Sequence, residues 1–349
     1  MTADRDPQLP TPPDRAGGAG PMLSATPAGP PRFVVPVRGR TCLVAARPTR
    51  LDVLAEVSAG WREWAVDPLG GWYAYVSPTH VPTVAWGHED GRRGRLPPSS
   101  RDMWSCLALT GGVLFVGGRQ SLVAYDLEAD GRVPVELELP PEFRAPEKAF
   151  DDLLVDGGRL LALDDVVSPK WLFTYDVTDP RRPRLTGRFG LSHGINETLH
   201  QIAVGGRWAA VRSEIGFRGG HLNAVRLLDR AGLGEVAQVT THRIDSWAAR
   251  PGPRHDWESV DLLDDVLLIA AGAEGVGVCD LSGERLPDPE DRSACRELAA
   301  RCGAGIRYRP VPGGGAVRRV HGLPGTRRML AVVETPDGPA DTVLADVPS

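Results

Sequence analysis

The sequence predicts an all-β fold, and three observations point to it. A unit made of a short apolar strand, a turn and a second strand ending in an acidic residue recurs along the 349 residues. Helical periodicity is nearly absent outside residues 292–302. Turns of the Gly-Gly or Asp-Gly kind precede the units and suit connections between antiparallel strands. Repetition of one small sheet is typical of a β-propeller, so we expect a single β-propeller with blades of antiparallel β-meanders.

The repeated unit occurs seven times, which favours seven blades over six. Its first strands begin near residues 41, 71, 111, 157, 205, 264 and 326. Their spacing brackets the roughly 40–50 residues of a propeller blade. The centres of several of these strands, such as LLAL and LLIA, are continuously apolar, as expected for a sheet covered on both faces. A pair of β-sandwiches is the weaker alternative, because it does not explain one unit repeated so often.

The two ends of the chain have different expected roles. Residues 1–31 are rich in Pro, Gly and Ala, which predicts a disordered tail before a propeller over residues 32–349. The last unit has too few strands for a four-stranded blade. The stretch RFVVPV from Arg32 is expected to supply the missing strand, so that the N- and C-terminal strands close the ring.

Residues 286–312 interrupt the rhythm of the units and predict a partly helical insertion outside the ring. The segment LPDPEDRSACRELAARCG from Leu286 is acidic at its start and is a candidate surface for a partner. Cys295 and Cys302 lie seven residues apart, about 10 Å along a helix, which is too far for a disulfide. The other cysteines are expected to be buried and inert: Cys42, Cys106 and Cys279.

One segment carries a more specific signal, WLFTYDVTDPRRPRLTGRF from Trp171. An apolar strand ends in Asp, a Thr-Asp-Pro turn follows, and a second proline precedes the next strand. The side chain of Asp179 can bond the backbone of its own turn, and Pro180 presets the φ angle there. The segment resembles the LVIVD-type bacterial propeller repeat, with the matching positions Asp176, Thr178, Asp179, Pro180 and Pro183. The resemblance implies a propeller and a bacterial source, and no particular reaction.

The other units keep only the outline of this repeat, for instance VAYDL from Val123 and VGVCDL from Val276. The fold is expected to be WD40-like, although the WD40 signature itself is not met. Gly-His occurs only at Gly87-His88 and Gly220-His221, and no unit ends in Trp-Asp.

Composition argues against several classes of protein. The net charge of −5 argues against a nucleic-acid-binding domain, which is usually basic. No stretch approaches the roughly 18 apolar residues of a membrane-spanning helix, and the N-terminus lacks the apolar core of a secretory signal. We therefore expect a cytoplasmic and monomeric protein. The motif His-Glu-x-x-His and the Walker loop are missing, so neither a zinc-protease site nor a phosphate-binding loop is predicted.

Four long connections between strands carry the candidate binding residues. Ligands of propellers usually meet such connections at one mouth of the central channel. At each connection a purely structural role competes with binding. These roles are an exposed ion pair, a capped turn, a hairpin tip, or an aromatic side chain that fills the space between blades. The candidates are, connection by connection, Asp165 and Lys170; His193, Asn196, Glu197 and His200; Arg218, His221 and Asn223; His255, Trp257 and Glu258.

For two of these candidates the sequence predicts a specific position. Asp165 and Lys170 belong to an insert that lengthens the hairpin after the strand LLALD, and Lys170 is one of two lysines in the chain. We expect both residues at a surface mouth or rim. A buried Lys170 would instead indicate a structural clamp.

Two functions remain open at this point. The first is a non-catalytic binding or scaffolding module without a cofactor, which recognises a protein or a small ligand through the mouth loops. The second is a metal-dependent hydrolase similar to the six-bladed lactonases, whose Glu, Asn and Asp side chains hold a divalent cation such as calcium. No motif of that family is matched. The side chains that would imitate its site are Asp165, Asn196, Glu197, Asn223 and Glu258. Convergence of Glu197, Asn223 and Glu258 on the axis would favour the hydrolase.

Overall fold

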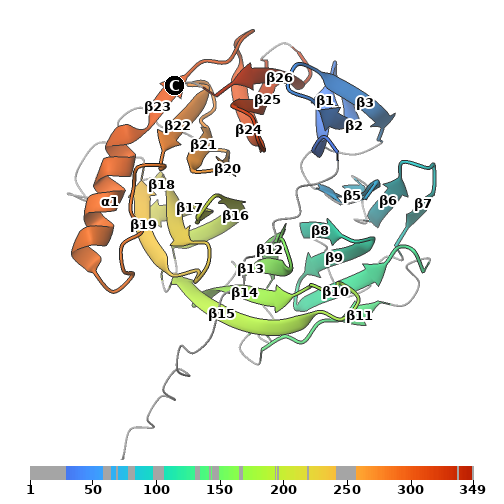
Figure 1. The fold of residues 1–349 in the computed structure, drawn as a ribbon, viewed down its shortest axis with the longest axis horizontal. Helices are drawn as coiled ribbons and strands as arrows, with labels where there is room; N and C mark the ends of the chain where they lie inside the picture. The colour runs from blue at the N-terminus through green and yellow to red at the C-terminus, as the bar shows by residue number, and fades with distance from the viewer. Residues whose placement is uncertain are drawn as a thin grey trace, which may run out of the picture.

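Seven antiparallel sheets surround a central axis in a computed structural model of the chain (Figure 1), which confirms the predicted seven-bladed propeller. The structure describes residues 29–57, 64–67, 70–77, 83–96, 106–129, 134–140, 143, 149–164, 168–192, 194, 196–217, 220–240, 257–335 and 338–347. The predicted tail over residues 1–31 lies outside the described residues except for its last three positions.

The blades follow one another along the chain, and each begins with its innermost strand. Blade 1 contains β1 (Arg32–Val37), β2 (Arg40–Ala46) and β3 (Leu51–Glu56). Blade 2 contains β4 (Trp64–Val66), β5 (Trp72–Ser77), β6 (Thr83–His88) and β7 (Arg93–Arg95). Blade 3 contains β8 (Cys106–Thr110), β9 (Val113–Gly118), β10 (Ser121–Asp126) and β11 (Val135–Glu136). Blade 4 contains β12 (Phe150–Asp156), β13 (Arg159–Asp164), β14 (Lys170–Asp176) and β15 (Arg184–Ser192).

The last three blades continue in the same order. Blade 5 contains β16 (Glu197–Gly205), β17 (Trp208–Phe217), β18 (Gly220–Asp229) and β19 (Glu235–Thr240). Blade 6 contains β20 (Ser259–Leu263), β21 (Val266–Ala270), β22 (Val276–Asp280) and β23 (Arg307–Arg309), and blade 7 contains β24 (Ala316–Leu323), β25 (Arg328–Glu334) and β26 (Asp341–Asp346).

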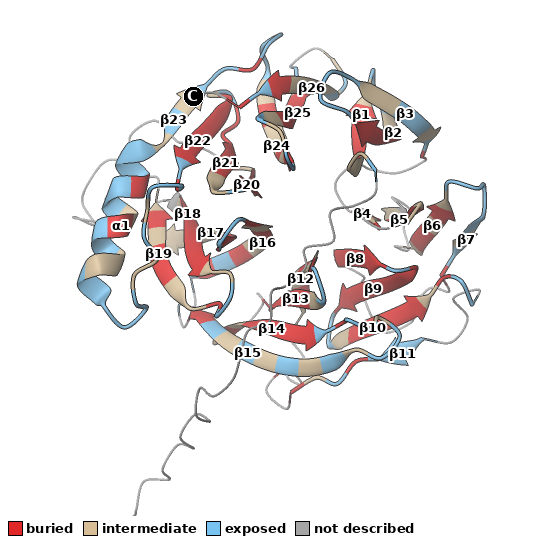
Figure 2. Ribbon diagram, in the orientation of Figure 1, coloured by how far each residue is buried: buried red, intermediate tan, exposed pale blue. Residues whose placement is uncertain are grey.

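The seven repeated units of the sequence are the second and third strands of the blades. In blades 2 to 6 these strands lie between two neighbours in their sheet and between two neighbouring blades, so their apolar runs are buried: every residue of β9 is buried, as are five of the six in β13 (Figure 2). Some innermost strands have a weaker apolar pattern, because one of their edges faces the channel. In β12 only three of seven positions are buried.

The acidic residue that ends the third strand has a structural cause. Its carboxylate accepts a hydrogen bond from the backbone N–H two residues further on, as an Asx turn does. Asp126 accepts from Glu128 at 3.0 Å, Asp176 from Thr178 at 2.9 Å and Asp280 from Ser282 at 2.9 Å. These bonds turn the chain out of the blade after its third strand.

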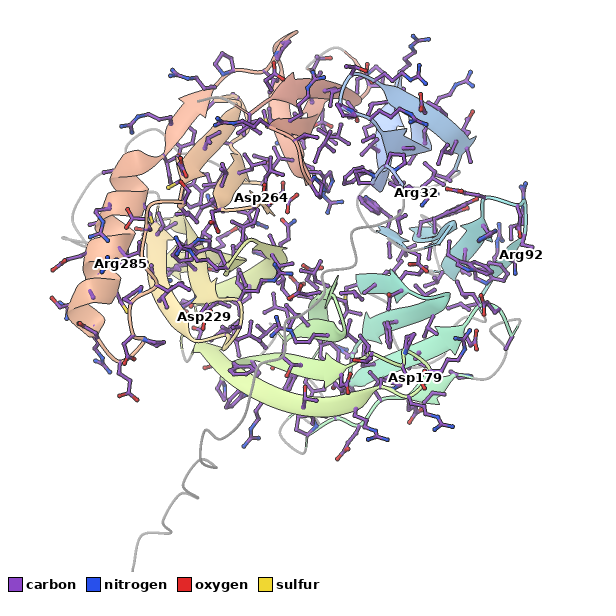
Figure 3. The ribbon with its side chains drawn as sticks, in the orientation of Figure 1. Arg32, Arg92, Asp179, Asp229, Asp264 and Arg285 are labelled. Carbon is purple, nitrogen blue, oxygen red and sulfur yellow. The ribbon has the colours of Figure 1, made fainter. Side chains whose placement is uncertain are left out.

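The turn of the LVIVD-like segment follows the same chemistry (Figure 3). Asp179 accepts a bond of 3.1 Å from the N–H of Arg181, as its sequence predicted. The guanidinium of Arg181 reaches the carboxylates of Asp126 and Glu128, each at 2.6 Å, and so connects the rim of blade 4 to the rim of blade 3.

The ring does not close as predicted. The strand that begins at Arg32 pairs with β2, from Arg32 opposite Ala45 to Val37 opposite Arg40, and it is the innermost strand of its own blade. In the described part of the chain, blades 1 and 7 each have three strands. The expectation of one shared sheet was therefore wrong, although the two terminal blades do lie side by side.

Side chains close the ring instead of a shared strand. Phe33 of β1, Trp64 of β4 and His321 of β24 meet where blades 7, 1 and 2 adjoin. The ring centroids lie 5.1 Å apart for Phe33 and His321, 5.6 Å for Trp64 and His321, and 6.5 Å for Phe33 and Trp64. We call these three residues the aromatic corner.

Helix α1 (Arg292–Gly305) runs along the outside of blades 5 and 6 (Figure 1) and covers the residues for which a helix was predicted. Asp291 caps its N-terminus by accepting bonds from two backbone N–H groups, and Leu298 and Cys302 are its buried residues. All five cysteines are free thiols, and Cys42, Cys106 and Cys279 are buried as expected. Within the described ranges, no helix has the length and apolar character needed to cross a bilayer.

Candidate functional site

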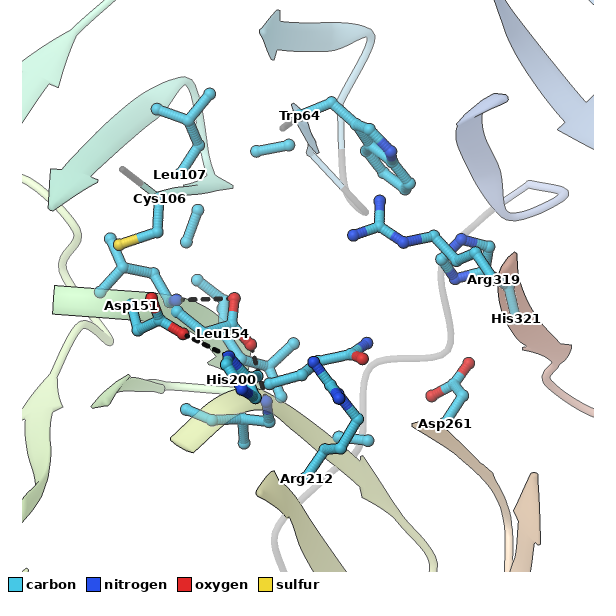
Figure 4. Close-up of a pocket in the computed structure, with 18 of the residues that line it drawn as sticks. Trp64, Cys106, Leu107, Asp151, Leu154, His200, Arg212, Asp261, Arg319 and His321 are labelled. Atoms are coloured by element: carbon cyan, nitrogen blue, oxygen red, sulfur yellow. Dashed lines mark hydrogen bonds and ion pairs between the residues drawn. The ribbon is translucent and has the colours of Figure 1, made fainter. Parts of the chain in front are cut away.

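The innermost strands enclose a channel of about 790 Å³ (Figure 4), whose two walls differ in chemistry. The wall formed by β4 and β8 is apolar and includes Ala65, Val66, Leu107 and Leu109. The opposite wall belongs to four consecutive blades, 4 to 7, and carries the charged groups. They are Asp151, Asp152, His200, Arg212, Glu258, Asp261, Arg318, Arg319 and His321.

Three polar side chains of the second wall bridge neighbouring blades. Asp152 of blade 4 accepts a bond of 2.7 Å from the N–H of Ile202 in blade 5. Gln201 of blade 5 accepts a bond of 3.0 Å from the N–H of Val260 in blade 6. Asp261 of blade 6 accepts a bond of 2.8 Å from the N–H of Gly322 in blade 7.

We call Asp152, Gln201 and Asp261 the bridging residues. An innermost strand pairs with one neighbour only, so the N–H groups on its other edge need another acceptor. Each bridging residue supplies that acceptor from the preceding blade. Burial raises the pKa of Asp261 to about 6, although the two backbone N–H groups that it accepts from and the charge of Arg319 act to lower it.

Other charged side chains of this wall form ion pairs or hydrogen bonds. Arg318 donates to Glu334 at 2.7 Å and to Glu258 at 2.5 Å. Arg212 donates to the backbone oxygen of Trp257 at 2.8 Å, and burial lowers the pKa of its guanidinium. The pair His200–Asp151 is looser, with 3.6 Å between Nδ1 and Oδ2, and both side chains are partly exposed in the channel.

The aromatic corner contributes Trp64 and His321 to the channel. Their ring nitrogens, Trp64 Nε1 and His321 Nε2, are buried and have no hydrogen-bond partner among the described residues. Burial, together with the positive charge of Arg319, lowers the pKa of His321 to about 3, so the imidazole is neutral at pH 7. The side chain of Arg319 extends into the channel toward Trp64 (Figure 4).

Of the twelve candidate residues from the sequence, His200 and Glu258 line the channel. Glu197 lies in a buried ion pair, where it accepts bonds from Arg226 at 3.0 and 2.6 Å and from Ser192 at 2.5 Å. Burial alone would raise the pKa of Glu197, but the bonds to Arg226 and Ser192 outweigh it and hold the pKa below its ordinary value.

Lys170 does not lie at a surface mouth or rim, so that expectation was wrong. It is the first residue of β14, opposite Ser192, and only 3% of its surface is exposed. Asp164, at the other end of the same loop, is fully buried. Charged residues are seldom buried in this way unless they are paired. Asp164 and Lys170, the two ends of the insert, are therefore part of the packed interior of the blade.

The remaining candidates divide into two groups. Trp257 is buried and its Nε1 donates to the hydroxyl of Tyr308 at 3.1 Å, so it fills space between blade elements. Asn223 is buried in β18, and Asn196 lies in the exposed turn before β16. Four candidates lie outside the described residues: Asp165, His193, Arg218 and His255. Of His221 only the backbone is described.

The ligand set of the hydrolase alternative is not brought together in the described residues. Glu258 lines the channel, whereas Glu197 is held by Arg226 inside blade 5. Among the residues that the structure describes, no group of three or more His, Cys, Asp and Glu side chains is placed to hold a metal ion.

Eight polar or charged channel residues were missed in the sequence: Asp151, Asp152, Gln201, Arg212, Asp261, Arg318, Arg319 and His321. A signal for the bridging residues existed. The segments HQIAV from His200 and SVDLL from Ser259 stand directly before predicted units, and each is a short apolar stretch that contains two polar residues. Such a segment indicates a strand with one edge on a polar space. For Arg319 and His321 no local signal distinguishes them from exposed residues.

No protein-family model matches the chain, and no curated protein matches it in sequence. Solved structures do match. The β-propeller domain of Cps50 (Swd1) from Myceliophteria thermophila has a TM-score of 0.53 at 10% identity, over 92% of this chain and 98% of that chain. The WD40 repeats of RRP9 have a TM-score of 0.51 at 12% identity, over 88% and 89%.

A structure from a study of two prolyl endopeptidases also matches, with a TM-score of 0.54 at 16% identity. It covers 92% of this chain but 48% of the other, so the chain spans about half the length of that protein. Identities this low show a shared propeller fold and nothing further about activity.

Proposed function

We propose that the protein is a non-catalytic propeller that binds a protein partner at the mouth of its central channel. One observation carries the proposal: the channel of about 790 Å³ has an apolar wall facing a charged wall. A concave site with apolar surface and a few polar groups is the usual form of a binding site. Propellers among the similar structures, such as the WD40 repeats of RRP9, support the fold on which the proposal rests.

Three carboxylates of the charged wall already have structural partners, which favours binding over catalysis. Catalysis by acid or base needs a group that can reach the substrate and exchange a proton with it. Asp152 and Asp261 accept backbone N–H groups of the neighbouring blades, and Glu258 is paired with Arg318. These carboxylates join neighbouring blades, and they also contribute charge to the wall of the channel.

We also propose that the protein is related to the LVIVD-type propellers. The turn after β14 supports this, since Asp176 and Asp179 both accept backbone N–H groups of the turn. A match of the whole chain to characterised LVIVD repeats in an alignment of its homologues would test the relationship.

The binding proposal can be tested by capture of partners from the host cell with two matched variants. The channel variant Asp151→Ala/His200→Ala removes a loose pair inside the channel. The control Arg40→Ala/Glu56→Ala removes an exposed pair of 3.0 Å in blade 1 that does not line the channel. The full chain is used as bait, and captured proteins are cross-linked and quantified by mass spectrometry.

We expect a defined partner to be captured equally by the wild type and the control, and at least about tenfold less by the channel variant. Equal capture by the channel variant would contradict binding at the mouth. Calcium-dependent hydrolysis of a lactone by the wild type, lost in the channel variant, would contradict the non-catalytic function.

A further inference from the structure

Blade 7 has an open outer edge at β26 (Figure 1). Within the described residues this blade contains three strands, whereas blades 2 to 6 contain four. The N–H of Val347 donates to the oxygen of Arg327 at 2.8 Å, which makes these residues a hydrogen-bonded pair. Because such pairs alternate along an antiparallel ladder, the N–H and C=O groups of Leu344 and Asp346 point away from β25. Neither N–H has an acceptor among the described residues.

A groove of about 410 Å³ lies beside this edge, between blades 6 and 7. Its wall on blade 7 includes Leu344, Ala345 and Asp346, the part of β26 that carries the open groups. Its wall on blade 6 includes Arg309 and Val311. An extended segment that pairs with β26 would therefore run along the groove as a fourth strand of blade 7, which is the mode of binding called β-augmentation.

The blade 6 side of this position is positively charged. Arg307 and Arg309 of β23 lie opposite Val278 and Val276 of β22. Both valines belong to the core between blades 6 and 7, and residues opposite each other share one face of a sheet, so the two arginines face blade 7. In the described part of the chain, Arg307 donates only to backbone oxygens and Arg309 has no ion pair. Acidic side chains on an added strand would be matched by these guanidinium groups.

The blade 1 side of the same position is apolar. Val53 of β3 lies opposite Val44, which belongs to the core between blades 1 and 7, so Val53 also faces blade 7. The surface of Val53 is nevertheless 54% exposed. Leu344 packs on this side as well, against the cluster formed by blades 1 and 7. An added strand with apolar side chains on this face would cover Val53 and extend the apolar surface of Leu344.

We infer that β26 binds an extended segment of a partner protein as the fourth strand of blade 7, and that the segment alternates apolar with acidic residues. The apolar side chains lie toward Leu344 and Val53, and the acidic ones lie beside Arg309. The groove shares no residue with the channel, so the inference goes beyond the proposed function and does not depend on it. The other occupants that a test must distinguish are β26 of a second copy and residues 1–28 of the same chain.

Fluorescence anisotropy with the full chain tests the binding of a fluorescein-labelled peptide, Thr-Val-Glu-Val-Glu-Val-Thr, with blocked termini. We expect saturable binding, at least about tenfold tighter than that of the same peptide with lysine in place of glutamate.

N-methylated peptides separate strand pairing from charge. The valines are the residues that hydrogen-bond to β26, because their side chains share the face of Leu344. N-methylation of the central valine is therefore expected to weaken binding about tenfold or more. N-methylation of one glutamate, whose N–H points away from β26, is the matched control and is expected to have little effect.

Two variants place the peptide on blade 7. Asp346→Pro removes an open N–H that the blade itself does not use, and we expect it to weaken binding about tenfold or more. Asp346→Ala keeps that N–H and is its control. Arg309→Gln is expected to weaken binding of the glutamate peptide by about 3- to 10-fold and to leave the lysine peptide unaffected. Its control is Arg285→Gln, which removes an exposed charge outside the groove.

The inference is overturned if the glutamate peptide does not bind the folded wild type, if both N-methylated peptides bind alike, or if the lysine peptide binds as tightly. Equal binding by Asp346→Pro and Asp346→Ala would overturn the position on β26. If Asp346→Pro does not fold, the N-methylated peptides still decide.

Two further outcomes assign the edge to another occupant and thereby contradict a partner strand. One is a stable dimer in light scattering that Asp346→Pro dissociates, which indicates β26 of a second copy. The other is a monomer that does not bind the peptide although hydrogen exchange shows the amides of Leu344 and Asp346 to be protected, which indicates residues 1–28.

Discussion

At the scale of single residues, the bridging residues explain why polar side chains stand on the innermost strands. Each of them accepts the backbone N–H of the next blade, at 2.7 Å for Asp152, 3.0 Å for Gln201 and 2.8 Å for Asp261. An apolar residue at any of these positions would leave a strand edge without an acceptor. The polar side chains of the bridging residues are therefore explained by the structure of the ring, without reference to a function.

Replacing Gln201 tests this cause. Gln201→Met preserves the shape of the side chain but removes the acceptor of the Val260 N–H, so we expect the free energy of unfolding to fall by about 1–3 kcal/mol. Gln201→Glu keeps an oxygen acceptor and is expected to lose less. Urea unfolding followed by tryptophan fluorescence measures both. Equal stability of Gln201→Met and the wild type would show that the bridge contributes nothing.

His321 makes a second prediction, about pH. Its pKa is about 3 in the folded protein and 6.5 ordinarily, so between these values the unfolded chain binds a proton that the folded protein does not. The stability that His321 contributes is present above pH 6.5 and is lost as the pH falls toward 3, with a slope of up to about 1.4 kcal/mol per pH unit.

His321→Phe keeps a ring against Phe33 and Trp64 and has no proton to bind. We expect the variant to lose less stability than the wild type between pH 7 and pH 4, measured by urea unfolding at each pH. Asp261 acts in the opposite direction, because its raised pKa makes stability fall as the pH rises from 3.8 to about 6. It is present in both proteins, so it largely cancels in the comparison. Parallel pH curves would contradict the prediction.

At the scale of elements, the contacts that hold the second and third strands of a blade differ from those that hold the first strand. Hairpins such as β13–β14 are covered by blades on both sides, and their register runs from Arg159 opposite Asp176 to Leu163 opposite Leu172. Their strand pairing is local in sequence, because it joins consecutive strands and ends at an Asx turn. The innermost strands depend on the ring, since their free edges are satisfied by the next blade.

Helix α1 is an element attached to this frame through few side chains. Leu298 is fully buried against the core of blades 5 and 6, while most of the outer residues of α1 are exposed. We expect Leu298→Ala to lower the free energy of unfolding by about 2–5 kcal/mol, or to release the helix alone. Hydrogen exchange of α1 amides distinguishes the two outcomes.

Ala300→Gly serves as the control for the helix, because it changes an exposed position of α1 and is expected to cost only about 1 kcal/mol. If Leu298→Ala costs no more than this control, α1 does not depend on its buried contact.

At the scale of the whole molecule, the ring is closed by packing and not by a shared sheet. Blades that contact only their neighbours make a propeller a chain of interfaces, and the interface between blades 7 and 1 joins its two ends. The aromatic corner and buried contacts between Val35, Val44 and Val332 form this interface. The backbone N–H of Arg38 also donates to Asp341 at 2.9 Å.

Removing one member of the corner therefore tests closure. We expect Phe33→Ala to lower the free energy of unfolding by about 2 kcal/mol, less than the 3–5 kcal/mol of a fully buried phenylalanine, because Phe33 is partly exposed. Leu54→Ala in β3 of the same blade is the control, since Leu54 is 43% exposed. Thermal unfolding of both variants gives the comparison, and equal melting temperatures would mean that the corner does not hold the ring.

The sequence by itself determined the seven hairpins, their acidic ends and the position of α1. Apolar runs, Asx turns and helical spacing depend on residues that are neighbours in the chain, so their pattern is visible there. Tertiary structure decided the rest. Trp64 and His321 lie 257 positions apart, and only the closed ring brings their rings to 5.6 Å. The burial of Lys170, the bridges of Asp152 and Gln201, and the charged wall of the channel likewise depend on neighbours from other strands and blades, which local sequence patterns do not encode.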